Sequence, residues 1–170
     1  MTDTIGFIGL GVMGGPMCRN IATKHSGRVL CFDLSHAARA ALADTKVEQM
    51  ESVEALANEA DIVCLSLPGG PQVLRVAESI ASSARPGTIV VDLSTTTVAD
   101  AREAGKLLAE QEIGFADCPV ARTREAAQQG KLSIMVGAIP ELYDRIRPVL
   151  DYMASDVTHG GDVGATEGRM

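Results

Sequence analysis

The sequence predicts an α/β fold in which helices cover both faces of a doubly wound, mainly parallel sheet. Short β-branched segments alternate with longer Ala-rich segments along the chain, and Gly or Pro residues separate them. Hydrophobic residues make up 46% of the 170 residues, which suits one well-buried domain. Aromatic residues make up only 3%. A core of aliphatic side chains suits helices packed on a parallel sheet better than a β-sandwich.

The first half of the chain is predicted to contain four strands and four helices. The strands are expected at residues 4–8, 28–33, 46–50 and 61–67, and the helices at residues 13–24, 35–44, 53–58 and 71–83. Met13, Met17 and Ile21 fall on one face of the first helix, as helical periodicity requires. Ser35 is a suitable N-cap for the second helix. The nearly continuous apolar run at 61–67 is typical of a strand covered on both faces.

The second half of the chain continues the same alternation. Strands are expected at residues 88–92, 113–117, 132–136 and 156–159, and helices at residues 98–111, 123–129 and 140–151. Repeated strand–helix units imply right-handed crossovers and therefore neighbouring parallel strands. The Gly-rich residues 160–164 are the one boundary-like feature of the chain.

Charge and cysteine content exclude several classes of function. The formal net charge of -7 and the pI of about 4.9 argue against a general affinity for nucleic acid. The cysteines are widely spaced, form no C-x-x-C pair and lie in apolar segments, so buried free thiols in a reducing compartment are expected. They are Cys18, Cys31, Cys64 and Cys118. The histidines also lack ligand spacing, so no metal site is predicted.

No targeting or membrane segment is predicted. The first residues lead directly into a strand, which leaves no room for a signal peptide. The chain also lacks an uncharged apolar run of the roughly 18 residues that a membrane span needs. We therefore expect a cytoplasmic protein that binds neither membranes nor nucleic acids.

The strongest motif is a Gly-rich turn between a predicted strand and a predicted helix. It reads Gly9-Leu10-Gly11-Val12-Met13-Gly14. The G-x-G-x-x-G spacing is a weak indication alone, but an acid, Asp33, follows nineteen residues beyond Gly14. Gly9 permits the tight turn, Gly11 lets the backbone approach a pyrophosphate, and Gly14 lets the helix pack close to the strand. This context predicts a Rossmann-type dinucleotide site; the alternative is an ordinary strand-to-helix turn.

Asp33 ends the second predicted strand, where its carboxylate can accept hydrogen bonds from the ribose hydroxyls of adenosine. The same charge would repel a 2′-phosphate, so NAD is expected as the cofactor and NADP is less favoured. Two alternatives stay open. Asp33 could merely cap the next helix, although Ser35 can do so, and Arg39 could accommodate a phosphate.

Two further loops are predicted at the same edge of the sheet. Leu67 and Pro68 follow one strand, and Ser94 and Thr95 follow the next. In open α/β sheets the carboxyl ends of the strands form the ligand crevice. Both segments therefore suit ligand contacts, but Pro, Ser and Thr are also ordinary turn residues.

Four segments carry a family resemblance. They are an N-terminal signature at residues 5–17, a D-x-S-T segment at 92–95, the start of a D-x-P-V-S-G-G motif at 117–120 and its continuation at 130–137. Together they resemble the β-hydroxyacid dehydrogenases, which include 3-hydroxyisobutyrate and 6-phosphogluconate dehydrogenases. The resemblance covers essentially the whole chain and implies the cofactor-binding domain of an NAD-dependent oxidoreductase. Such an enzyme transfers hydride between NAD and a small hydroxy acid or semialdehyde, with Thr95 by the nicotinamide ribose and residues 67–68 facing the cofactor.

The chain departs from the family motif at the substrate segment. Ala121, Arg122 and Thr123 replace Ser-Gly-Gly, whose serine and glycine amides hold the substrate carboxylate in the family. Ala121 lacks the hydroxyl donor. Arg122, Thr123 or Arg124 could supply replacements, because arginine suits bidentate contact with a carboxylate or phosphate. Substrate binding there would indicate a different or more acidic acid than hydroxyisobutyrate; the alternative is that the two arginines are solvated charges at a helix start.

The family's general acid/base lysine is not found in the chain. In the family it lies in a segment that opens a long helix into an all-α C-terminal domain, and residues 161–165 match the beginning of that segment. The resemblance thus implies a dinucleotide-binding domain at residues 1–160 and the start of an interdomain helix at 161–170, with the lysine at or just past Met170. No catalytic residue is predicted within the chain, which alone is expected to bind NAD weakly and to turn over nothing. A homo-oligomer formed through the C-terminal domain is also expected.

Two other functions stay open. A non-catalytic dinucleotide-binding module would explain both departures from the family pattern. An imine or ketone reductase-like relative would explain a residue other than lysine at Met170. The residues that follow would discriminate, because a lysine followed by x-x-Asn favours the dehydrogenase.

Overall fold

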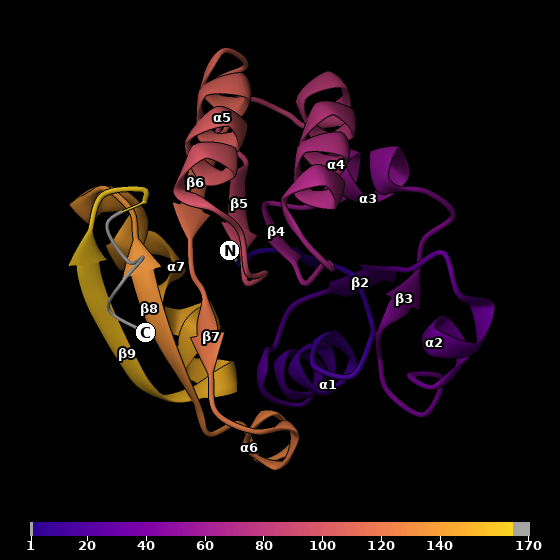
Figure 1. The fold of residues 1–170 in the computed structure, drawn as a ribbon. Coiled ribbons are helices and arrows are strands. Elements are labelled where there is room, and N and C mark those ends of the chain that lie inside the picture. Colours follow the sequence, from indigo (N-terminus) through magenta and orange to yellow (C-terminus); the bar gives the residue numbers. More distant parts are fainter. Residues whose placement is uncertain (1, 165–170) are drawn as a thin grey trace.

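The computed structural model describes residues 2–164, in which one nine-stranded sheet is flanked by helices (Figure 1). The strands are β1 Ile5–Ile8, β2 Val29–Phe32, β3 Glu48–Gln49, β4 Ile62–Leu65, β5 Ile89–Asp92, β6 Gly114–Asp117, β7 Val120–Ala121, β8 Leu132–Gly137 and β9 Ala154–Gly161. The helices are α1 Gly14–Lys24, α2 His36–Ala40, α3 Val53–Glu59, α4 Gly70–Ser83, α5 Val98–Ala109, α6 Arg124–Gln129 and α7 Pro140–Met153. The predicted alternation of strands and helices is confirmed.

The strand order places the carboxyl ends of β1 and β4 side by side. From one edge the order is β3-β2-β1-β4-β5-β6-β8-β7, with β9 paired to β8. The strands from β3 to β6 run parallel, so the predicted doubly wound, mainly parallel sheet is confirmed. The chain leaves β1 toward β2 on one side and returns to β4 on the other. This creates the switch point at which open α/β sheets bind their ligands.

Helices cover both faces of the sheet, as the apolar strands predict. In β4, Ile62 and Cys64 share a buried cluster with side chains of α1 and α7, whereas Val63 and Leu65 share another with side chains of α3, α4 and α5. Figure 1 shows α3, α4 and α5 on one side of the central strands and α1 on the other. Burial on both faces explains why this strand is apolar at every position.

The later part of the sheet departs from parallel order. β8 is antiparallel to β6 and β7, and β9 runs parallel to β8. The expectation of parallel neighbours is wrong here, because β7 takes up part of the chain between β6 and β8 and pairs antiparallel with β8, which leaves only the short helix α6 for a crossover. A parallel pair needs a crossover of about a dozen residues or more, usually with a helix that covers the sheet. β7 itself was not predicted, since two residues show no alternating pattern.

The helix predicted at residues 35–44 is shorter in the structure. Ser35 caps it as predicted, because its hydroxyl accepts a hydrogen bond from the Ala38 N–H at 3.2 Å. The regular helix ends earlier, and the guanidinium of Arg19 in α1 donates to the Ala41 carbonyl at 2.9 Å. That carbonyl is therefore satisfied by a side chain from another helix rather than by a continuing turn.

Residues 161–164 do not begin a helix. Gly161 is the last residue of β9, and residues 162–164 form a bend and a turn. The rest of the predicted interdomain helix, residues 165–170, lies outside the described residues, as does the predicted lysine position at or past Met170.

The cysteines lie in the core as predicted. All four are buried and free, and burial raises the pKa of the Cys64 thiol to about 12. Over residues 2–164 no His, Cys, Asp and Glu side chains are grouped so that they could hold a metal ion. In the same part of the chain, no helix combines the length and the apolar character that crossing a bilayer requires.

The side chain of Asn20 joins α1 to α6. Its amide nitrogen donates to the Ala127 carbonyl at 2.9 Å and to the Pro16 carbonyl at 3.1 Å. Helix α6 has six residues, of which only Ala127 is fully buried. Hydrogen bonds from Asn20 therefore help to hold this short helix against α1.

Asn20→Asp should destabilise the fold, because a carboxylate has the shape of the amide but no hydrogen to donate. The Ala127 carbonyl keeps a bond from the Gly130 N–H at 3.3 Å, so the cost is that of the lost side-chain bonds. We therefore expect the free energy of urea unfolding to fall by ~0.5–1.5 kcal/mol. Asn58→Asp introduces the same charge at an exposed position of α3 and should change stability little. Equal unfolding free energies for the two variants would contradict this role of Asn20.

Candidate cofactor-binding site

The Gly-rich turn joins β1 to α1 and lies against the chain that leaves β4. Gly9 has a φ of 98°, and a Cβ there would stand 2.0 Å from the Ser66 carbonyl oxygen. A Cβ on Gly14 would stand 1.9 Å from the Gly9 carbonyl oxygen. Non-bonded atoms do not approach so closely. Only glycine at these two positions therefore lets the turn, the helix and the end of β4 meet.

The turn presents open backbone donors. No backbone carbonyl within residues 2–164 accepts a hydrogen bond from the N–H groups of Gly11, Val12 or Met13. A Cβ added to Gly11 would meet nothing within 4 Å, so a ligand can approach the backbone there. The donors stand at the start of the 11-residue helix α1, whose dipole also favours an anion. The turn can thus hold a phosphate group through main-chain atoms.

Asp33, which directly follows β2, fixes the Gly-rich turn through hydrogen bonds. One carboxylate oxygen accepts a hydrogen bond from the Leu10 N–H at 2.7 Å, and the other accepts one from the Ser35 N–H at 2.7 Å. Each carboxylate oxygen has a second lone pair and can still accept a bond from a ligand hydroxyl. Asp33 thus supports the turn and the start of α2 while it keeps acceptor capacity for a ligand.

A cavity of about 650 Å³ brings most of the predicted cofactor residues together. Its walls come from the Gly-rich turn, the end of β2, the loop after β4 and one face of α4. The lining residues predicted from the sequence are Gly9, Gly11, Val12, Met13, Gly14, Asp33, Leu67 and Pro68. Sequence reasoning missed the residues from α4, which are Gln72, Arg75, Val76 and Ser79. Their spacing of three or four positions marks one helix face and is the signal that could have found them.

Leu10 and Thr95 are the two predicted cofactor residues that do not line this cavity. Leu10 is 5% exposed, and its contribution is the N–H bond to Asp33. Thr95 follows Ser94, whose hydroxyl accepts a hydrogen bond from the Leu67 N–H at 2.8 Å. This bond fixes the loop after β5 to the loop after β4, so the two predicted cofactor loops are joined.

Two buried carboxyl groups lie at the ends of the strands that carry these loops. Asp92 and Asp117 end β5 and β6 and are register partners. One oxygen of Asp92 accepts a hydrogen bond from the Ser94 N–H at 3.0 Å, and its Oδ2 is buried without a partner among residues 2–164. Burial raises the pKa of Asp92 to about 7, although the hydrogen bonds from Ser94 oppose the shift. A group that titrates near neutral pH therefore holds Ser94 in place.

The predicted substrate segment lies at β7 and the start of α6. Ala121 ends β7, and Thr123 caps α6 by accepting a hydrogen bond from the Ala126 N–H at 3.2 Å. Arg122 stands between them with a φ of 93°, in the left-handed region that favours glycine. The chain therefore places an arginine in a backbone conformation suited to the glycine of the family motif.

The Arg122 guanidinium is held at the edge of the sheet. It donates to the Lys131 carbonyl and the Ser155 hydroxyl, both at 2.8 Å, and lies 3.6 Å from the Asp156 carboxylate. The side chain is 44% exposed, so it is partly solvated as well as bonded to the sheet edge. To bind a substrate carboxylate, the guanidinium would have to exchange these partners.

Comparisons with known proteins find relatives over nearly the whole chain. The family model for the NAD binding domain of 6-phosphogluconate dehydrogenase matches residues 4–161. The 2-(hydroxymethyl)glutarate dehydrogenase of Eubacterium barkeri is 37% identical over 164 residues, which are 95% of this chain and 54% of that protein. The 3-hydroxyisobutyrate dehydrogenase of Pseudomonas aeruginosa is 33% identical over 168 residues, which are 97% of this chain and 56% of that protein.

A solved structure shows the same fold. The 3-hydroxyisobutyrate dehydrogenase of Mycobacterium tuberculosis, determined with L-serine, superposes with a TM-score of 0.93 at 36% identity. The match covers 97% of this chain and 56% of that chain. The present chain thus spans about half the length of the relatives that it matches. The matched region includes the Gly-rich turn and the cavity beside it.

Asp92→Asn should make the stability of the fold less dependent on pH. The pKa of Asp92 is about 7 in the folded chain and 3.8 in the reference state, so the folded state binds the proton more tightly. The contribution of this group is therefore most stabilising at low pH and is lost as pH rises between these two values, by up to ~1.4 kcal/mol per pH unit. Asparagine can still accept the bond from the Ser94 N–H but does not titrate.

Urea unfolding of both proteins across that pH interval measures the effect. The free-energy difference between Asp92→Asn and the unsubstituted chain should grow in favour of the variant as pH rises. Asp144→Asn, at an exposed position of α7, serves as the charge control and should follow the unsubstituted chain. An Asp92→Asn profile parallel to that of the control would contradict the prediction.

Proposed function

This chain belongs to the family of the NAD binding domain of 6-phosphogluconate dehydrogenase, and on that premise we propose that it binds NAD within an enzyme that transfers hydride to and from a small hydroxy acid. One observation carries the proposal. The open N–H groups of the turn, the Asp33 carboxylate and the loop at residues 67–68 meet in one cavity. A dinucleotide requires donors for its diphosphate, an acceptor for its adenosine ribose and apolar contacts for its rings.

The charge at the end of β2 supports NAD over NADP. The Asp33 carboxylate would accept hydrogen bonds from ribose hydroxyls but would repel a 2′-phosphate. The next residue, Leu34, is 92% exposed and brings no compensating charge. Arg39, the next cation along the chain, keeps its guanidinium 5.8 Å from the centre of the Phe32 ring. A contact between Arg39 and a 2′-phosphate would compete with that ring contact.

The chain's own residues would hold and orient the cofactor. When bound, NAD supplies a hydride acceptor, and its reduced form supplies the hydride. The N–H groups of the turn would fix the diphosphate, and Thr95 with residues 67–68 would position the nicotinamide end. The Ser94–Leu67 hydrogen bond supports this role, because it sets the distance between those two loops before a ligand arrives.

We propose the segment of Ala121, Arg122 and Thr123 as the place for the substrate carboxylate. Two relatives are named for hydroxy acids, 2-(hydroxymethyl)glutarate and 3-hydroxyisobutyrate, and this supports a small hydroxy acid as the substrate class. No residue among 2–164 is proposed as the general acid/base. The resemblance assigns that role to a lysine at or just past Met170, outside the described residues.

Gly11→Ala tests the proposed cofactor site. The new Cβ would stand in the open space before the donors of the turn without touching the protein, so the fold should be unchanged. We expect NADH affinity to fall at least about tenfold, which corresponds to ~1.4 kcal/mol. Fluorescence titration of the 170-residue chain with NADH measures affinity, and the thermal unfolding midpoint checks the fold.

Gly105→Ala is the matched control for this test. Gly105 lies in α5, where an added Cβ meets the Phe115 ring at an ordinary 3.4 Å. The same methyl group is thus added to the chain away from the turn. Equal NADH affinity for the two variants would contradict the proposed site.

Asp33→Asn should shift the cofactor preference toward NADP. The substitution removes the charge that repels a 2′-phosphate but keeps an oxygen that can accept from the Leu10 or Ser35 N–H. We expect the ratio of NADPH affinity to NADH affinity to rise about tenfold, a change of ~1.4 kcal/mol. Asp144→Asn removes one negative charge from α7 and should leave the ratio unchanged. Equal rises in both variants would reveal only a net-charge effect.

A further inference from the structure

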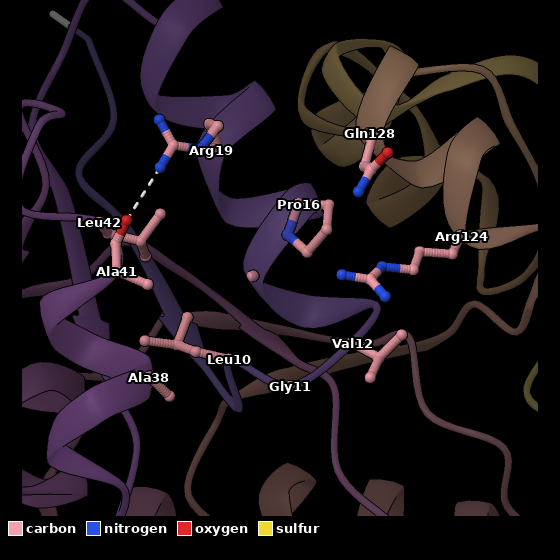
Figure 2. A pocket seen from close by; sticks show the side chains of 11 residues that line it. Leu10, Gly11, Val12, Pro16, Arg19, Ala38, Ala41, Leu42, Arg124 and Gln128 are labelled. Carbon is pink, nitrogen blue, oxygen red and sulfur yellow. Dashed lines mark hydrogen bonds between the residues drawn. The ribbon is translucent and has the colours of Figure 1, made fainter.

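A second cavity, of about 410 Å³, lies on the outer side of the Gly-rich turn between α1, α2 and α6 (Figure 2). It shares Gly11 and Val12 with the cofactor cavity, so the two cavities adjoin at these residues. Most of its lining is aliphatic or glycine. The polar side chains are Arg19 of α1, which points toward Ala41, and Arg124 and Gln128 of α6 on the opposite side.

Arg19 already has partners for its charge. Its guanidinium forms two hydrogen bonds with the Asp44 carboxylate, at 2.8 and 2.9 Å, and a third with the Ala41 carbonyl. The last of these bonds is drawn in Figure 2. Arg19 therefore helps to shape the outer cavity but contributes little net charge to it.

Arg124 is the cation of this cavity that has no such partner. Within residues 2–164 its guanidinium makes no hydrogen bond and no ion pair. Figure 2 shows the side chain reaching from α6 into the space between Val12 and Pro16, with its nitrogen atoms toward the centre of the cavity. The guanidinium thus approaches the outer side of the same turn whose N–H groups are open.

The position of Arg124 in α6 does not stabilise its positive charge. It is the first residue of the helix, where the helix dipole disfavours a cation, and Thr123 already provides the cap. A guanidinium with no carboxylate partner here gains nothing from the helix itself. An anion beside the turn would give the charge a partner.

We propose that Arg124 binds the diphosphate of the cofactor from the outer side of the turn, opposite the N–H groups of Gly11, Val12 and Met13. The inference rests on the proposed function and adds a residue that the Gly-rich motif does not contain. A diphosphate carries two negative charges, whereas the turn offers neutral donors only. Guanidinium groups bind phosphate oxygens in a bidentate manner, and Arg124 stands where its charge would complement those donors.

The test compares Arg124→Gln and Arg124→Lys with the unsubstituted 170-residue chain. NADH, NADPH, ADP and 2′-AMP serve as probes, and calorimetry measures their affinities. We expect Arg124→Gln to weaken NADH, NADPH and ADP about tenfold each, because all three carry the diphosphate. Binding of 2′-AMP, which has no diphosphate, should be unchanged. Arg124→Lys should recover part of the loss, since it keeps the charge but not the bidentate geometry.

Glu125→Gln is the control for net charge. Glu125 is the exposed neighbour of Arg124 in α6, and the substitution changes the charge by the same amount in the opposite direction. If charge at this helix start acted only over long range, Glu125→Gln would strengthen NADH binding as much as Arg124→Gln weakens it. That result would overturn a direct contact, whereas a much smaller gain supports it.

The outcomes separate this inference from the proposed function. NADH and ADP affinities that are unchanged in Arg124→Gln would overturn the role of Arg124 and leave the cofactor site intact. A loss confined to NADPH and 2′-AMP would place the guanidinium at a 2′-phosphate and would also overturn the inference. An unsubstituted chain that binds neither NADH nor ADP would overturn both proposals.

Discussion

Fold and site both depend on one close approach of backbones, where the Gly-rich turn meets the end of β4. A Cβ on Gly9 would stand 2.0 Å from the Ser66 carbonyl oxygen, and one on Gly14 would stand 1.9 Å from the Gly9 carbonyl oxygen. Because both side chains are absent, the start of α1 lies directly at the switch point between β1 and β4. The open N–H groups, the cofactor cavity and the outer cavity all follow from that position.

Side chains at the strand ends fix the loops around this contact in pairs. Asp33, after β2, holds the N–H of Leu10 in the turn after β1. Ser94, after β5, is held by Asp92 and in turn holds the N–H of Leu67 after β4. The loops after the four central strands β2, β1, β4 and β5 are thus joined in two pairs by hydrogen bonds, one pair on each side of the switch point. Donors that are fixed before a ligand arrives lose less conformational entropy when it binds.

Local patterns predicted the features that neighbouring residues determine. The turn, Asp33 and the Ser35 cap were readable because strand, glycine spacing and helix start follow one another along the chain. The antiparallel β8 was not, because it depends on a short connection that the strand pattern does not reveal. The partners of Arg122 were equally hidden. One of them, Ser155, lies 33 residues away and joins it only through the pairing of β8 with β9.

Arg122 stands where the family motif has glycine, and this departure changes the role of the substrate segment. A left-handed conformation at a residue other than glycine costs ~1–2 kcal/mol, and the bonds from its guanidinium to Lys131 and Ser155 can offset that cost. The arginine is thus held in a backbone suited to glycine, so the segment keeps its course and Thr123 still caps α6. Among residues 2–164, the arginine of this segment without a partner is then Arg124, the residue after the cap. Arginine at 122 therefore stabilises the sheet edge, and the cation that faces the turn is Arg124.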